Sequence, residues 1–118
     1  TLEELFEGAA RTMLSLMFAA ADVRAAAERR VDLEAGDLEE LMFLWLNELL
    51  FIMDGEGFLP SEFEVKISGE WSLNALVKGE PIDLSRHRVR SELKAATYHQ
   101  MEVRRQGDGW AAMVVFDV

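Results

Sequence analysis

The chain has 118 residues, and its 22 acidic against 12 basic side chains give a formal net charge of −10, which disfavours direct binding of nucleic acid. The length predicts one domain over residues 1–118, and the 50% share of apolar residues predicts a folded core rather than disorder. The sequence has no cysteine, which excludes disulfides and thiolate sites, and it shows no signal-peptide or membrane-span pattern, so we expect a cytoplasmic protein.

The first third of the chain is predicted to form a helix and then a strand. The helix starts at the capping box Thr1-Leu2-Glu3-Glu4 and has apolar residues at helical spacing to about Phe18. The stretch from Ala25 to Ala35 then alternates in polarity, with Val31 and Leu33 on the side that we expect to be buried. This period of two is typical of a strand.

A second helix is expected to be the main element of the core. It starts at Asp37, its N-cap, with Glu40 as the reciprocal partner, and it ends in the glycine-containing segment 54–57. Its wide apolar stripe consists of Leu38, Leu41, Met42, Trp45, Leu46, Leu49, Leu50 and Met53. A stripe of this width predicts extensive burial.

The rest of the chain is predicted to form two β-hairpins joined by a polar connection over 80–91. The first hairpin alternates over 63–67 and 71–77 on either side of a turn at Ser68-Gly69. The second consists of a strand over 93–105, a turn over 106–109 and a strand over 110–116. We therefore predict an α+β fold of two layers, with two helices packed on one face of a mixed, mostly antiparallel sheet.

Catalytic motifs are scarce. The sequence has no glycine-rich phosphate loop, no nucleophile elbow and no metalloprotease helix motif. His87 lies among three arginines, and we expect it to be solvated. His99 lies in the uncharged part of a strand, where the sequence is equally consistent with a hydrogen-bonded edge histidine and with a functional one. A metal-dependent hydrolase is disfavoured because no general base or nucleophile is recognisable.

The last two residues are a candidate cation site. Asp117 follows an apolar strand, and the carboxylate of Val118 lies next to its side chain. Two adjacent carboxylates repel each other unless water screens them or a cation neutralises them, and hard divalent cations take such oxygen ligands. A solvated terminus explains the same pair without a metal, and helix capping fully explains Asp37. The residues alone leave both interpretations open.

Nearly all of the acidic excess lies in the first half of the chain. Residues 1–60 contain 13 acidic and 4 basic side chains, and many of the acids stand at the two helix starts. Solvated helix starts explain this pattern, and a negative face for a basic partner is the alternative.

Several segments, taken in order along the chain, resemble the archease family. They are Leu2-Glu3-Glu4-Leu5-Phe6-Glu7, Asp37-Leu38-Glu39-Glu40-Leu41, Trp45-Leu46-Asn47-Glu48-Leu49-Leu50, Glu56-Gly57-Phe58, Gly79-Glu80-Pro81 with Arg86-His87, Lys94-Ala95-Ala96-Thr97-Tyr98-His99, and Val115-Phe116-Asp117-Val118. The string over 94–99 and the Phe-Asp-hydrophobic terminus are the most specific of these segments.

The resemblance implies a protein cofactor rather than an enzyme. Archeases activate the GTP-dependent RNA ligase of tRNA splicing and RNA repair, and they promote its guanylylation and multiple turnover without ligating RNA themselves. Family members carry a divalent cation, typically calcium, at a cluster of aspartates. The resemblance thus implies Asp117 and the Val118 carboxylate as ligands, with Asp37 as a third candidate and with Lys94 and His99 flanking the site. The acidic face would dock to the basic, RNA-binding side of the ligase.

The chain also departs from the family pattern. It starts where the first family helix starts, so the preceding strand with its His-Thr-Ala-Asp motif is missing, either by truncation or as a property of this member. We expect that loss to remove one metal ligand and to expose strand edges, which invites self-association. Met53 stands where many members have a histidine. A general chaperone-like module for nucleic-acid-modifying enzymes is the alternative function.

Overall fold

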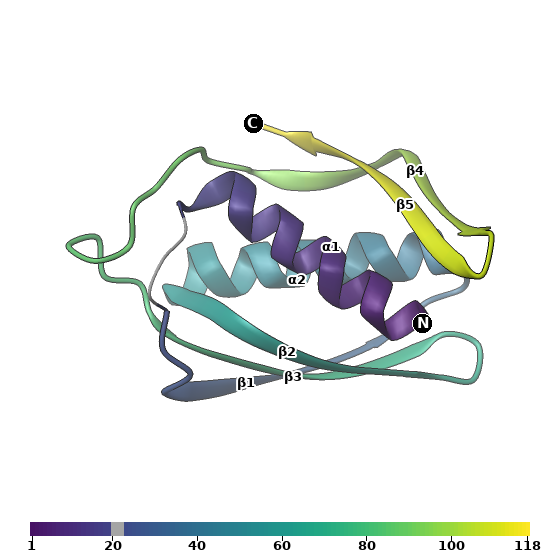
Figure 1. Cartoon of the computed structure of the whole chain (residues 1–118), viewed down its shortest axis with the longest axis horizontal. Helices are drawn as coiled ribbons and strands as arrows, with labels where there is room; N and C mark the ends of the chain where they lie inside the picture. Colours follow the sequence, from purple (N-terminus) through teal and green to yellow (C-terminus); the bar gives the residue numbers. More distant parts are fainter. Residues whose placement is uncertain (20–22) are drawn as a thin grey trace.

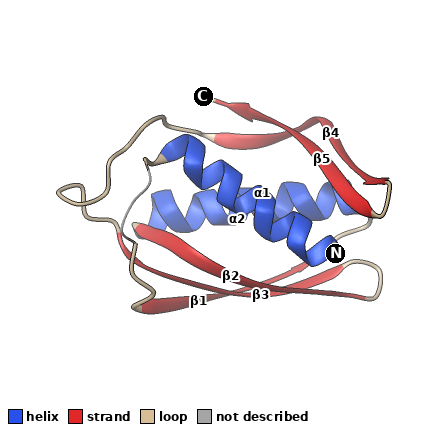
Figure 2. Ribbon diagram, in the orientation of Figure 1, coloured by secondary structure: helices blue, strands red, loops and turns tan. Residues whose placement is uncertain are grey.

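Two helices lie between two β-sheets in the computed structural model, which describes residues 1–19 and 23–118 (Figure 1). The elements are α1 (Leu2–Met17), β1 (Ala27–Glu34), α2 (Leu38–Glu56), β2 (Phe58–Ser68), β3 (Ser72–Pro81), β4 (Ala95–Gln106) and β5 (Gly109–Asp117). Figure 2 shows the helices in blue between the red strands of the two sheets. Within the described residues, no helix is long and apolar enough to span a membrane.

The strands form a three-stranded sheet in the order β1-β3-β2 and a two-stranded sheet of β4 and β5. The predicted α+β class and the packing of two helices on antiparallel strands are confirmed. The arrangement differs from the prediction in that the strands divide into two sheets, giving three layers, and in that every described strand pair is antiparallel. Alternation in a sequence indicates which face a side chain occupies but not which strand lies beside it, so the pattern could not separate the two sheets.

The helix starts follow the predicted capping chemistry, with one difference. In α1 the Thr1 hydroxyl accepts a hydrogen bond from the Glu4 amide at 3.1 Å, and the Glu4 carboxylate accepts from the Thr1 amino group at 2.7 Å. In α2 the Asp37 carboxylate accepts from the Glu40 amide at 2.8 Å. The Glu40 carboxylate accepts from the amide of Gly36 at 2.7 Å rather than from that of Asp37. The reciprocal half of the predicted box is therefore displaced by one residue.

Helix α2 is the core element, as predicted. Seven of the eight stripe residues are buried and Leu38 is half-buried. The Trp45 indole donates a hydrogen bond to the Phe6 carbonyl at 3.0 Å, and its ring meets the Phe63 ring edge-on at 6.0 Å between centroids. Ile52, outside the predicted stripe, is also buried. Sheets on both sides of α2 explain why its apolar surface exceeds a single stripe.

The turns also fall near their predicted positions. Gly57 ends α2 in the left-handed conformation, with φ of 63°, which favours glycine because it has no Cβ. The β2–β3 turn is closed by Ser68 opposite Ser72, with Gly69 at φ of 57° between them. These turns place the alternating apolar residues of β2 and β3 on the face that packs against the helices.

Side chains of α2 fasten the second sheet. The Asn47 amide donates a hydrogen bond to the Ala96 carbonyl at 3.0 Å and accepts one from the Ala96 N–H at 2.9 Å. Farther along β4, the Glu39 carboxylate accepts from the Val103 N–H at 3.0 Å. The helix thus satisfies backbone groups of β4 that would otherwise need a neighbouring strand.

Candidate functional site

His87, which we expected to be solvated, is buried, with 1% of its surface exposed. Its Nδ1 accepts a hydrogen bond from the Asp83 N–H at 2.9 Å, so the neutral ring carries its proton on Nε2. That Nε2 lies 3.2 Å from the Glu80 carboxylate. The prediction was wrong because one of the surrounding arginines, Arg86, turns inward and pairs with the same carboxylate.

The Glu80 carboxylate accepts hydrogen bonds from separate parts of the chain. Hydrogen bonds from the Arg86 guanidinium and then from the Arg24 amide, at 2.7 Å, lower the pKa of Glu80 to about 2, with a smaller contribution from His87. The carboxylate is therefore ionised while only 5% of the residue is exposed. This cluster fixes the loop after β3 against the segment before β1. The Gly-Glu-Pro and Arg-His motifs were the sequence signals that could have revealed it.

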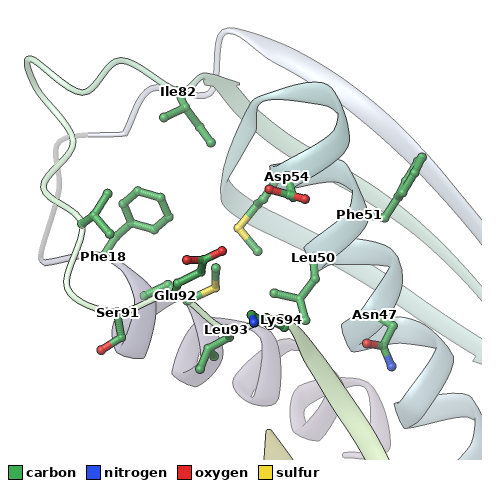
Figure 3. A pocket seen from close by; sticks show the side chains of 13 residues that line it. Phe18, Asn47, Leu50, Phe51, Asp54, Ile82, Ser91, Glu92, Leu93 and Lys94 are labelled. Atoms are coloured by element: carbon green, nitrogen blue, oxygen red, sulfur yellow. The ribbon is translucent and has the colours of Figure 1, made fainter. Parts of the chain in front are cut away.

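The loop after β3 forms one wall of the main pocket (Figure 3). The pocket has a volume of about 540 Å³, which lies in the range typical of ligand sites. The end of α1, the second half of α2 and the segment leading into β4 form its other walls. The lining residues are Met17, Phe18, Asn47, Leu50, Phe51, Met53, Asp54, Ile82, Val89, Ser91, Glu92, Leu93 and Lys94.

The backbones of two predicted site residues, Lys94 and Asp117, are joined beside this pocket. The Lys94 N–H donates a hydrogen bond to the Asp117 carbonyl at 2.8 Å, and Asp117 is paired with Ala95 across the two strands. Ala96, the next residue of β4, is buried against the helices, so Ala95 and Asp117 face away from them. Asp117 and Val118 are both exposed.

Asp37 occupies a different part of the molecule. It is the N-cap of α2. Asn47, which bonds β4 near the end of the sheet that contains Asp117, lies about 15 Å farther along the helix axis. In the described part of the chain, no three or more histidine, aspartate or glutamate side chains form a group that could hold a metal ion. The calcium site therefore stays a prediction.

His99 lies in an irregular part of β4 that the sequence pattern did not reveal. Residues 98–101 interrupt the pairing of β4 with β5, and Gln100 has φ of 60°. His99 is exposed there, and the half-exposed Tyr98 meets the Phe43 ring edge-on at 5.6 Å between centroids. Burial, and then the negative charges of the α2 N-terminal turn, raise the pKa of Tyr98. This bulge presents an aromatic side chain beside an acidic helix start, and Tyr98 was not among the predicted site residues.

Comparison with known proteins places these features in a family. The model of the archease protein family matches residues 1–118. The chain belongs to the archease family. Archeases from Methanosarcina barkeri and Methanothermobacter thermautotrophicus are 36% and 41% identical to this archease, over 100% and 99% of its chain and 84% and 85% of their own.

Solved structures share the fold of this archease. The solution structure of a Methanobacterium thermoautotrophicum protein matches it with a TM-score of 0.81 and 42% identity, over 98% of this chain and 83% of that one. The crystal structure of an archease, named a possible chaperone, from Thermotoga maritima matches with a TM-score of 0.66. That protein is 24% identical over 100% of this chain and 84% of its own, so it bears on the fold alone.

Proposed function

We propose that this archease is a non-catalytic cofactor of the GTP-dependent RNA ligase of tRNA splicing and RNA repair, acting in the cytoplasm. It promotes guanylylation of the ligase and multiple turnover. The observation that carries the proposal is the match of the whole chain to the archease family. Residues 95–99 of the string and the Phe116-Asp117 terminus, which carried the resemblance, lie on the paired strands β4 and β5.

The charge distribution supports a role in binding a basic partner. The first turns of both helices carry exposed or half-exposed acids, namely Glu3, Glu4, Glu39 and Glu40. An activator needs only to bind one state of its partner better than another, so no reaction centre is required. Association with the basic, RNA-binding side of a ligase should become slower as the salt concentration rises.

We also propose that this archease binds a divalent cation, calcium, through Asp117 and the Val118 carboxylate. Carboxylate oxygens suit calcium, and both residues are exposed. Asp37, the third candidate, is a separate question because it also caps α2. Asp37→Ser keeps a good N-cap, so a loss of calcium affinity at unchanged stability would identify Asp37 as a ligand. Unchanged calcium affinity, measured by calorimetry, would remove it from the set.

The direct test is guanylylation of the purified ligase by GTP with and without calcium-loaded archease. We expect this archease to raise the rate and to allow multiple rounds of ligation. Asp117→Ala should abolish the stimulation while circular dichroism and urea unfolding stay unchanged. Asp108→Ala, which removes an exposed acid at the β4–β5 turn, is the matched control and should stimulate fully. No stimulation by the calcium-loaded, unsubstituted protein would refute the proposal.

The alternative is a general chaperone-like module for nucleic-acid-modifying enzymes. The exposed acids at the two helix starts suit this second candidate as well, because they complement basic partners in general. The order of addition separates the two functions. A chaperone raises the yield of active ligase only when present during refolding, whereas an activator stimulates ligase that is already folded.

A further inference from the structure

The main pocket has a buried apolar floor and an exposed apolar rim. Leu50 and Met53 in the floor are 5% and 3% exposed. Phe51 of α2 and Val89 of the loop after β3, which also line the pocket, are 59% and 53% exposed. Large apolar side chains left in water around a concave site mark a surface that binds another molecule.

The charges of the pocket select the kind of molecule that fits. Asp54 from α2 and Glu92 from the loop line it, together with Lys94 (Figure 3). Across residues 1–19 and 23–118, neither carboxylate forms an ion pair or a hydrogen bond to another side chain. Two carboxylates against one ammonium leave an excess of negative charge beside an apolar floor. A ligand with an apolar body and a cationic group complements both features.

The wall that carries Glu92 is held in place before any ligand binds. Glu80 and His87 fasten the loop to β3 at one end, and the Arg90 N–H donates a hydrogen bond to the Met17 carbonyl at 2.7 Å near the other. The Ile82 N–H donates to the Gly57 carbonyl at 2.7 Å. A preformed wall lowers the ordering cost of binding.

We propose that this pocket binds a segment of the ligase that inserts an apolar side chain over Leu50 and Met53 and places an adjacent arginine or lysine against Asp54 and Glu92. This proposal rests on the proposed function for the identity of the partner. Nucleic acid is a poor occupant, because its phosphates would face two carboxylates on a chain of net charge −10. Arginine and the large aromatic side chains are enriched among the residues that dominate protein interfaces.

The first experiment tests the pocket without the ligase. Amide resonances of this archease are followed by NMR during titration with phenethylamine, 2-phenylethanol and 3-phenylpropionate, which share an aromatic body and differ in charge. Shifts at Asn47, Asp54 and Leu93 should be largest for the amine and smallest for the carboxylate. The Asp54→Asn/Glu92→Gln double variant should lose this order. No binding, or a preference for the carboxylate, would overturn the proposal.

The second experiment measures the affinity for the purified ligase. Asp54→Lys should weaken binding by about tenfold or more, because it reverses a charge at the interface. Glu62→Lys makes the same change in net charge at an exposed position of β2, outside the pocket, and should leave the affinity within about twofold of the unsubstituted protein. Equal losses in both variants would overturn the proposal.

The two experiments also separate the pocket from the proposed function. If the unsubstituted protein does not bind the ligase, both the proposed function and the ligase as the ligand of the pocket are refuted. The amine preference then still decides whether the pocket selects an apolar cation.

Discussion

Asn47 should contribute strongly to stability because its side chain bonds both backbone groups of Ala96. Ala96 is 2% exposed, so Asn47→Ala leaves its N–H and C=O groups buried without a protein partner. Each buried backbone group without a partner costs about 1–3 kcal/mol. Two such groups add up to about 2–6 kcal/mol, and water that enters from the pocket beside Asn47 reduces this cost, so we expect Asn47→Ala to lower the free energy of unfolding by about 2–4 kcal/mol.

The assay is urea unfolding, with the slope against denaturant used to check that the denatured state is unchanged. Asn74→Ala is the matched control, because Asn74 bonds the Asp32 carboxylate at 2.6 Å on the surface. That loss should stay within about 0.5 kcal/mol. Hydrogen exchange of the Ala96 amide should accelerate in Asn47→Ala by more than exchange in β2 and β3. Equal losses in the two variants would refute the reasoning.

Two further predictions concern the end of β3. The pKa of Glu80 is lowered from 4.5 to about 2 in the folded protein. Between these pH values the unfolded chain therefore binds more protons than the folded one. The contribution of Glu80 to the free energy of unfolding is lost as the pH falls through this interval. The difference in unfolding free energy between the unsubstituted protein and Glu80→Gln should therefore have its full size above pH 4.5 and decrease toward pH 2. A difference that does not change with pH would contradict the lowered pKa of Glu80 as its cause. Gly79→Ala would place a Cβ 2.1 Å from the Leu59 carbonyl oxygen and should destabilise by about 1–3 kcal/mol in thermal or urea unfolding. Gly8→Ala, which has open space in α1, should instead stabilise by about 0.5–1 kcal/mol, and the same sign for both would contradict the steric argument.

Local patterns predicted the elements well because their causes are local. The N-cap of α2 at Asp37 and the apolar stripe of that helix depend on residues that are close together in the sequence. The turn between β2 and β3 likewise follows from Ser68-Gly69 and the alternation on either side. The division into two sheets depends instead on which strands meet across the helices, and no pattern within a strand encodes that choice.

The candidate site was less predictable because its parts come from distant segments. His87 has basic neighbours in sequence, but its environment is set by Glu80 and by the Asp83 amide once the loop closes. The pocket joins the end of α1, the second half of α2 and the loop after β3, so neither Asp54 nor Glu92 stood out in the sequence. Resemblance to a family pointed to Lys94 and Asp117, whose backbones are hydrogen-bonded in the structure.

The position of the helices between the sheets sets an order of events during synthesis. All strands of the first sheet and both helices precede residue 82, whereas β4 and β5 span 95–117. A growing chain can therefore build one side of its core while the other side of α2 stays uncovered. A chain that ends before β4 keeps this apolar face of α2 open, so prematurely ended chains should be the aggregation-prone products of this gene.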